Sequence, residues 1–180
     1  VPGAFMSMLG SRLLNEMVIE KGITTANDIL SELKSHIIKA LGQTGITGET
    51  RDGMDASLCI WHKDTNILEF AGAYNPLYIV RNQQSAVGLR TANCQLPTAD
   101  CELIEIKADK QPIGYHPDKN SPFTRQEIQL QAGDTIYLFS DGYADQFGGD
   151  KNKKFSYTQF KELLLSVQDR AMEEQKQILD

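Results

Sequence analysis

Apolar residues at helical spacing open the chain and predict two helices. From about residue 2 to residue 21 they recur every three or four positions, and Gly22 follows where a helix C-cap is expected. A second stripe of the same period runs from about residue 26 to residue 41, with threonines before it as candidate N-caps and Gly42 after its end. Each helix therefore has one face that we expect to be buried.

After the loop from Gly42 to Gly53 the period changes to two, which is typical of strands with one buried face. We predict strands at residues 56–62, 68–73, 77–81, 102–107, 123–130 and 135–139. The residues Lys63 to Asn66 suit the turn of a hairpin between the first two strands. Two further helices are predicted at 155–167 and 171–179.

Two helices, a run of antiparallel strands and then helices again indicate an α+β fold rather than a parallel βαβ sheet. The chain of 180 residues is long enough to bury one substantial core. No repeat, low-complexity segment or linker divides the sequence. We therefore predict a single domain over residues 1–180.

The charge and the cysteine content of the chain limit the kinds of binding partner and the cellular compartments that we expect. The formal net charge is −6, and Lys and Arg form no cluster longer than residues 151–154, which disfavours a nucleic-acid partner. The three cysteines form no CxxC pair, so reduced thiols in a cytosolic setting are expected. No apolar run approaches the roughly 20 residues that span a bilayer. We predict a cytoplasmic domain, alone or as the cytoplasmic module of a membrane-linked sensor.

The segment YLFSDGYADQF, residues 137–147, places Asp141 where an apolar strand ends, with Gly142 letting the backbone turn without a Cβ clash. Rigid carboxylates at strand ends are ligands that Mg²⁺ and Mn²⁺ use, because these hard ions take oxygen donors. In the competing interpretation Asp141 and Gly142 form a simple turn and Asp145 caps the segment that follows. One aspartate by itself does not make a metal site.

A second acidic cluster lies in RDGMDASLCIW, residues 51–61. Asp52 precedes a glycine, and this pair is common in turns, so a turn is the favoured interpretation for Asp52. Asp55 stands where the loop enters an apolar strand, and we expect its carboxylate to be partly buried unless a polar group meets it.

Other catalytic signatures are missing from the sequence. His36, His62 and His116 lack metal-ligand spacing such as HExxH, and a packed or solvated position is the favoured interpretation for the first two. No serine stands in a GxSxG elbow and no cysteine has an adjacent base. Covalent nucleophilic catalysis therefore has no local signature here.

Four segments in order carry a family resemblance: VPGAFMSMLG, LEFAGAYNPLYIVR, KADKQPIGY and GDTIYLFSDGYADQFGG. Together they resemble the SpoIIE-type serine phosphatases of the metal-dependent PP2C-like (PPM) superfamily, over nearly the whole chain. The resemblance implies an α-β-β-α sandwich of two antiparallel sheets flanked by helices, with a two-metal site of Mg²⁺ or Mn²⁺ at one edge. Asp141 matches the family's catalytic metal-binding aspartate, and we expect Gly142 and Asp55 to contribute to the same site.

The sequence departs from the family pattern at both ends. The family's first helix normally follows an Asp-x-x-Gly-His-Gly stretch, and this chain begins at Val1, just after that point. The family also ends with a strand that carries an Asp-Asp pair, and this chain stops at Asp180. We therefore expect a partial domain without its terminal strands, with weak metal binding, negligible phosphatase activity and sheet edges prone to form a homodimer.

The resemblance implies a protein serine/threonine phosphatase that serves as a bacterial signalling output. A metal-activated water would attack phosphoserine or phosphothreonine in a protein substrate, such as a phosphorylated anti-sigma-factor antagonist, with a sensor or receiver domain upstream. The alternative is a catalytically dead domain that binds a phosphoprotein or regulates through its first two helices. A third interpretation, an unrelated α+β interaction domain, requires all four matches to be accidental.

Overall fold

The computed structural model describes residues 3–46, 51–82, 101–118, 121–148 and 153–180. These residues divide into two compact units. The first unit comprises Val1–Leu77 and Lys107–Leu130, and the second comprises Tyr78–Ile106 and Gln131–Asp180. The prediction of a single domain stays a prediction, and each unit is described by itself.

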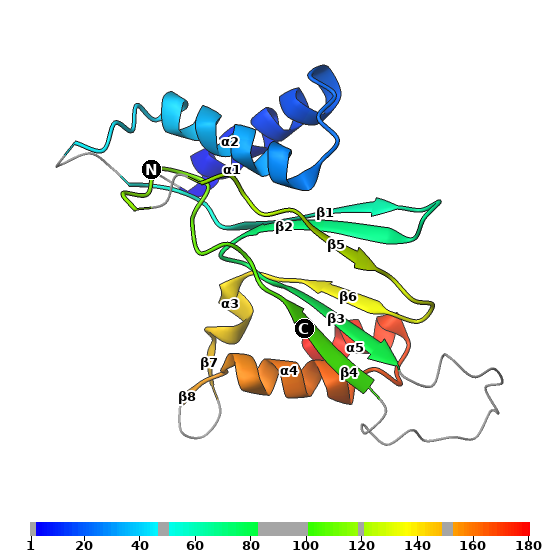
Figure 1. Ribbon diagram of the computed structural model, residues 1–180. Helices are drawn as coiled ribbons and strands as arrows, with labels where there is room; N and C mark the ends of the chain where they lie inside the picture. The colour runs from blue at the N-terminus through cyan, green and yellow to red at the C-terminus, as the bar shows by residue number, and fades with distance from the viewer. Residues whose placement is uncertain (1–2, 47–50, 83–100, 119–120, 149–152) are drawn as a thin grey trace. The chain divides into compact units, whose positions relative to one another are not determined.

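The first unit begins with the two predicted helices (Figure 1). Helix α1 spans Gly3–Asn15 and continues as a π-helical turn, η1, over Glu16–Glu20; helix α2 spans Ala26–Ala40. Gly22 and Gly42 follow them with φ of +64° and +62°, a left-handed conformation that glycine adopts without a Cβ clash. The predicted helix ends are thereby confirmed, although the last turn of the first helix is π-helical.

An antiparallel sheet carries α2 in the first unit (Figure 1). Its order is β1 (Ala56–His62), β2 (Ile67–Ala73), β5 (Gln126–Gln129), and β1 matches its predicted range residue for residue. The fifth predicted strand is shorter than expected, and Phe123, at its predicted start, lies outside the strand and packs into the core. That core joins the helices to the sheet through Met6, Leu13, Met17, Ala26, Leu30, Leu33, Ile37, Ala71, Ala73, Ile113 and Phe123.

A buried carboxylate connects α2 to the sheet. The Glu69 side chain is only 1% exposed on β2, and one of its oxygens accepts a hydrogen bond from the Ala26 backbone N–H in the first turn of α2. Arg125 Nη2 lies 2.8 Å from the other oxygen, Oε2, and His62 Nε2 lies 3.6 Å from it. No hydrogen-bond donor of the described residues is aligned with Oε2, so its charge is compensated by the ion pair with Arg125.

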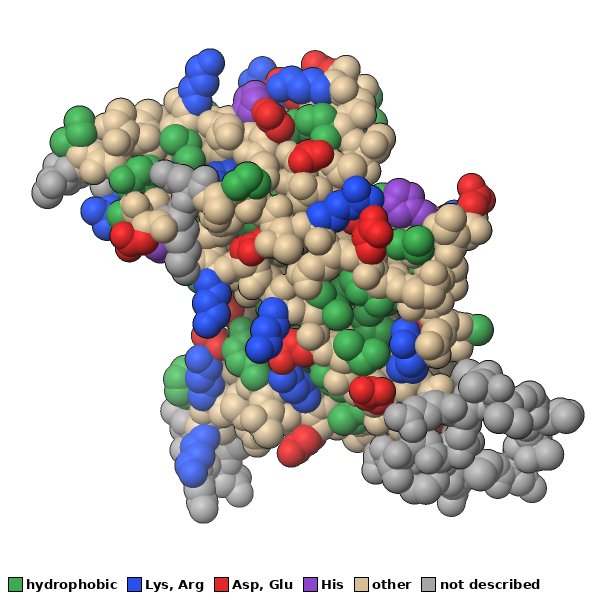
Figure 2. Space-filling view, viewed as in Figure 1, with side chains coloured by type: hydrophobic (Ala, Val, Ile, Leu, Met, Phe, Trp, Pro, Cys, Tyr) green, Lys and Arg blue, Asp and Glu red, His purple; other side chains and the backbone are tan. Residues whose placement is uncertain are grey.

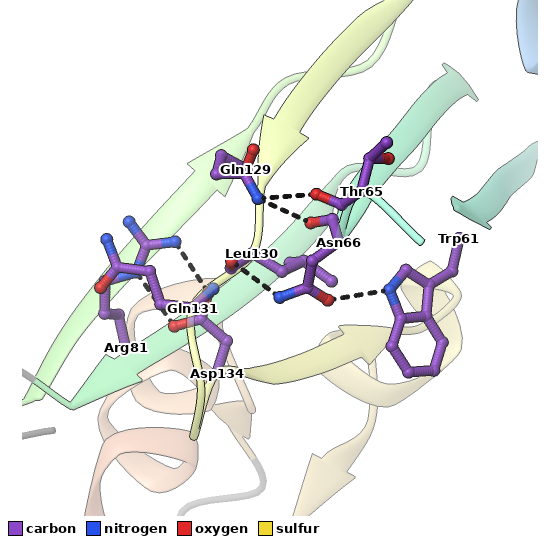
Figure 3. Close-up of polar contacts among 8 residues, drawn as sticks. All are labelled: Trp61, Thr65, Asn66, Arg81, Gln129, Leu130, Gln131 and Asp134. Carbon is purple, nitrogen blue, oxygen red and sulfur yellow. Dashed lines mark hydrogen bonds and ion pairs between the residues drawn. The ribbon is translucent and has the colours of Figure 1, made fainter. Parts of the chain in front are cut away.

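The predicted hairpin turn between β1 and β2 is held by Asn66, which has a φ of +56° (Figure 3). Trp61 Nε1 donates to Asn66 Oδ1 at 3.1 Å, and Asn66 Nδ2 donates to the Leu130 carbonyl at 3.0 Å. The same side chain therefore fixes the hairpin and the end of β5.

The second unit contains the sheet β4 (Cys101–Ile106), β3 (Leu77–Asn82), β6 (Thr135–Leu138), in that order. Its other elements are α3 (Asp141–Ala144), a short hairpin of β7 (Phe147–Gly148) and β8 (Lys153–Lys154), α4 (Tyr157–Ser166) and α5 (Met172–Leu179). The strands β3, β4 and β6 and the last two helices lie within two residues of their predicted bounds. Helix α3 and the hairpin were not predicted.

Aromatic side chains form the core of the second unit. Phe160 of α4 lies edge-on to Phe139, with 4.9 Å between ring centroids, and 6.2 Å from the ring of Tyr78 on β3. Burial, with the charge of Glu105 as a smaller cause, raises the pKa of Tyr78 to about 12. Tilted and edge-on rings are the favourable arrangements for aromatic pairs, so these contacts join α4 firmly to the sheet.

A bidentate ion pair clamps β3 to the turn before β6 (Figure 3). Arg81 Nε donates to Asp134 Oδ1 at 2.9 Å and Arg81 Nη2 donates to Oδ2 at 2.7 Å, while the Gln131 N–H donates to Oδ2 at 2.9 Å. Burial by itself would raise the pKa of Asp134, but the hydrogen bonds from Arg81 and Gln131 outweigh it and leave the pKa lowered. The Asp134 carboxylate, 3% exposed, is thus fully partnered.

We predict that Arg125→Met destabilises the first unit by about 2 kcal/mol, because it leaves the buried Glu69 charge without its main partner. Urea unfolding followed by the fluorescence of Trp61, the one tryptophan of the chain, measures this. Glu127→Gln is the matched control, since Glu127 is half exposed and pairs with the same arginine at 2.6 Å. Exposed pairs contribute about 0–1 kcal/mol, so a control as damaging as Arg125→Met would contradict the account.

We predict that the contribution of Asp134 to stability is lost in acid. The lowered pKa of the folded carboxylate means that its stabilisation is complete above the unfolded value, about 3.9, and disappears as the pH falls through the folded value. Asp134→Asn should therefore cost about 2 kcal/mol at neutral pH and progressively less below about pH 4.

Urea unfolding followed by far-UV circular dichroism at several pH values measures this difference. Asp169→Asn serves as control, because Asp169 is half exposed beside Arg170. A gap between wild type and Asp134→Asn that does not change with pH would show that the carboxylate charge is not what stabilises the clamp.

Candidate functional site

Asp141 lies on a short helix and not at the end of a strand. Strand β6 ends at Leu138, two residues without regular structure follow, and Asp141 begins the four-residue helix α3. The preceding strand is also less buried than the sequence predicts, since Leu138 is 51% exposed. The expectation of a buried strand with a carboxylate at its tip is therefore wrong in this detail.

Gly142 does not have the conformational role that the sequence suggested. It lies inside α3 and is not among the glycines with positive φ in the described residues. A Cβ added there would meet only Ser140 Oγ, at an ordinary contact distance of 3.5 Å. The helix provides the change of direction after β6, so the backbone does not need a glycine to turn.

The residues after Gly142 anchor α3. Ala144 is fully buried, and the Tyr143 ring lies 4.7 Å from Phe160 and 5.9 Å from Phe155 between centroids. The Tyr143 hydroxyl donates to the Leu179 carbonyl at 2.8 Å, and burial, aided by the charge of Asp180, raises the pKa of Tyr143. Helix α3 therefore has one buried side, while Asp141 and Gly142 are exposed.

The Asp141 carboxylate has no hydrogen bond or ion pair with the residues that the structure describes. The hydrogen bond to Asp145 is the chief cause of the raised pKa of Lys154, and the charge of Asp141 is a smaller cause. Asp145, the other acid of the segment, is the C-cap residue of α3 and does not cap the segment that follows. Its carboxylate pairs with Lys154 at 2.7 Å and is not free. Strand β8 carries Lys153 and Lys154, both exposed, and Figure 2 shows basic side chains at the lower left, where this hairpin lies.

Asp55 belongs to the first unit and is exposed, so its carboxylate is not buried where the loop enters the strand. Met54 forms an antiparallel bridge with Ile113 and turns its side chain onto α1 and the core. Alternate residues of extended backbone point to opposite sides, so Asp55 faces away from that core. Its place beside Asp141 stays a prediction.

The donor set supports a metal only in part. An exposed carboxylate at Asp141 fits a Mg²⁺ or Mn²⁺ ligand, and the Gly142 carbonyl is a second oxygen of the right kind. Within the described ranges, no group of three or more His, Cys, Asp or Glu side chains is placed to hold an ion. Since Mg²⁺ takes six oxygens, other residues and water would have to complete such a centre.

The three histidines have ordinary partners, and Cys59 is a poor nucleophile. His36 Nδ1 lies 2.9 Å from the Glu32 carbonyl, His62 pairs with Glu69, and His116 Nδ1 accepts from the Asp118 N–H at 3.2 Å. Burial raises the pKa of Cys59 to about 11, so it is a thiol and a poor nucleophile at neutral pH. Cys94 lies outside the described residues.

Comparison with known proteins places this arrangement in a family. The family model described as Stage II sporulation protein E (SpoIIE) matches residues 1–180. The chain belongs to the SpoIIE family. The solved SiaA-PP2C domain of Pseudomonas aeruginosa is 25% identical, with a TM-score of 0.77 over 99% of this chain and 61% of that one. No curated protein shows a significant match.

Membership of the SpoIIE family confirms the resemblance read from the four sequence segments. The α+β, PP2C-like fold with antiparallel sheets and helices is confirmed as well. The family is one of PP2C-like serine phosphatases and is typically metal-dependent. In the described part of the chain, no helix has the length and apolar character needed to cross a membrane.

The sequence analysis missed the long-range contacts that hold α3 and the turn before β6. Tyr143 lies in the middle of the segment 137–147. No local sequence pattern indicates its hydrogen bond to Leu179, which lies 36 residues later. Arg81 and Asp134 are likewise 53 residues apart. The one sequence signal for Tyr143 is its position two residues after Asp141, the proposed ligand.

Proposed function

We propose that this chain belongs to a protein serine/threonine phosphatase that hydrolyses phosphoserine or phosphothreonine in a protein partner with the help of Mg²⁺ or Mn²⁺. The observation that carries the proposal is the SpoIIE match over residues 1–180, supported by the TM-score of 0.77 to the SiaA-PP2C domain. The chain spans 61% of that domain, so activity, substrate and partners are parts of the proposal.

Asp141 is the residue to which we assign the metal. Its carboxylate is exposed and free of hydrogen bonds from the described residues, and α3 holds it on an anchored backbone, where Asp145 N–H donates to the Asp141 carbonyl at 2.9 Å. A bound dication supplies a Lewis acid that neutralises phosphoryl charge and lowers the pKa of water. Asp141 and the Gly142 carbonyl would hold it, with Asp55 the further candidate.

The number of ligands limits what the residues can do by themselves. Two oxygens from α3 cannot replace much of the hydration shell of Mg²⁺, which dehydrates reluctantly. We therefore expect weak metal binding and, from the 180-residue chain, hydrolysis that is negligible next to that of a complete two-metal site. The protein partner would be a phosphoprotein, such as an anti-sigma-factor antagonist, with a sensor or receiver domain upstream and self-association through exposed sheet edges.

The few ligands near Asp141 favour one second candidate. Because no three metal-ligating side chains gather in the described residues, the chain could serve as a phosphoprotein-binding or regulatory module without catalysis. If this second candidate function holds, the chain should bind a phosphoserine peptide and release no phosphate from it in the presence of Mn²⁺.

We predict that Asp141→Asn weakens Mn²⁺ binding by at least about tenfold, since loss of a ligand should cost no less than loss of an outer-shell partner. Water-proton relaxation in Mn²⁺ titrations measures the affinity. Asp169→Asn removes an exposed carboxylate from the same unit and should leave the affinity unchanged. Equal binding by both variants would contradict the assignment of Asp141.

The same variants test hydrolysis. Mn²⁺-dependent cleavage of p-nitrophenyl phosphate should be slow for this chain and disappear in Asp141→Asn, whereas Asp169→Asn should keep it. Rapid turnover by the 180-residue chain would refute the ligand count given above. A rate that does not depend on Mn²⁺ would refute the metal-dependent mechanism.

A further inference from the structure

Tyr74 has an unusual backbone conformation just after the end of β2. Its φ is +58°, and among the described residues Asn66 is the one other non-glycine residue with a positive φ. The Asn75 N–H donates to the Ala73 carbonyl at 2.7 Å, so Tyr74 is the central residue of a γ-turn. A γ-turn with positive φ at its centre is the rare, strained form. Asparagine is common at positive φ, whereas a bulky residue such as tyrosine is an outlier there.

Hydrogen bonds on both sides hold this turn in place. The Tyr74 N–H donates to the Asp109 carbonyl at 2.9 Å, and the Asp109 N–H donates to the Gly72 carbonyl at 3.0 Å. The Ser57 hydroxyl donates to the Asn75 carbonyl at 2.7 Å. Strained residues persist only where the surrounding structure fixes them in this way, and they are concentrated at functional sites.

The Tyr74 side chain does little for the fold in return for this strain. It is 44% exposed, and in the described part of the chain neither an aromatic pair nor a hydrogen bond of its hydroxyl engages it. Glycine would adopt the same turn without a Cβ clash. A half-exposed tyrosine at this position therefore needs a reason outside the packing of its own unit.

A basic residue lies beside Tyr74. Ala73 and Asp109 form a parallel bridge, so Tyr74 and Lys110 are the next residues of the two segments, and both are exposed. The Asp109 carboxylate accepts from the N–H and the hydroxyl of Thr124 at 2.7 Å and 2.9 Å, so both of its oxygens are in use. The end of β2 thus presents an aromatic ring and an ammonium group in a chain whose net charge is −6.

We propose that Tyr74 and Lys110 contact the phosphorylated protein partner, with the tyrosine ring as the anchor and the lysine as the group that attracts phosphate. Tyrosine suits an anchor because it offers a large, rigid surface with few rotatable bonds, and it is enriched at protein interfaces. Lysine binds phosphate as a point charge. The proposal rests on the proposed function for the phosphorylated partner, but it needs no metal at Asp141.

Two substitutions at Tyr74 separate the ring from the backbone strain. Tyr74→Ala removes the ring and keeps the Cβ, so its stability should be close to that of wild type. Tyr74→Gly also removes the Cβ, and the equilibrium constant of folding should be about fivefold larger than for Tyr74→Ala, because release of the strain outweighs the extra freedom of glycine in the unfolded chain. At an unstrained position alanine is the more stable of the two. Urea unfolding followed by the fluorescence of Trp61, in the same unit, measures this.

Fluorescence anisotropy of a fluorescein-labelled acidic peptide with one phosphoserine measures the partner contact, in buffer without divalent cations so that no phosphate is released. Both Tyr74 variants should bind this phosphopeptide at least about fivefold more weakly than wild type, the loss typical of an important interface residue. Lys110→Gln should weaken binding of the phosphopeptide and leave binding of its unphosphorylated counterpart nearly unchanged. Phe5→Gln and Lys39→Gln remove an exposed ring and an exposed lysine from the same unit and should bind like wild type.

The outcomes separate this proposal from the proposed function. If wild type binds the phosphopeptide and both Tyr74 variants bind it equally well, the contact role is overturned and the proposed function stands. If wild type binds both peptides alike, the surface does not recognise phosphate and the role of Lys110 is overturned. If wild type binds neither peptide, the contact role is overturned, whereas Mn²⁺-dependent cleavage of p-nitrophenyl phosphate still decides the proposed function.

The stability measurements can overturn the contact role independently. A Tyr74→Ala variant far less stable than wild type would assign the ring to the fold. A Tyr74→Gly variant no more stable than Tyr74→Ala would remove the strain from which the contact role is inferred.

Discussion

Each unit of this protein is built around a buried carboxylate that an arginine and a backbone N–H compensate. Glu69 receives the Ala26 N–H and the charge of Arg125 in the first unit. Asp134 receives the Gln131 N–H and two bonds from Arg81 in the second. A buried charge without partners costs several kcal/mol, so these bonds determine where the first helix turn of α2 and the turn before β6 can lie.

Asp141 differs from both of these carboxylates. It is exposed, and among the described residues no cation or N–H pairs with its side chain. A carboxylate that contributes nothing to the packing of its unit is available to a ligand, whereas Glu69 and Asp134 are fully used by the fold. This contrast in partners, more than the residue type, supports the proposed role of Asp141 as a ligand.

Family membership and local geometry contribute different parts of the functional argument. The SpoIIE match concerns the whole chain and shows the family, from which the proposed class of reaction follows. The described residues show how the one acid is supported: an aromatic core beneath α3, and α5 beyond it, joined through Tyr143. Because α3 has only four residues, the support has to come from elements that are distant in sequence.

The sequence by itself determined the elements whose signals are local. Strand β1 and the turn at Asn66 agree with the prediction, as do the helix ends at Gly22 and Gly42, because periodicity and glycine conformation act over a few residues. Only the tertiary structure decided that Asp141 begins a helix, that Gly142 needs no special backbone angle and that Asp55 faces outward. These features depend on contacts such as Met54 with Ile113 and Tyr143 with Leu179, which connect residues that no local pattern relates.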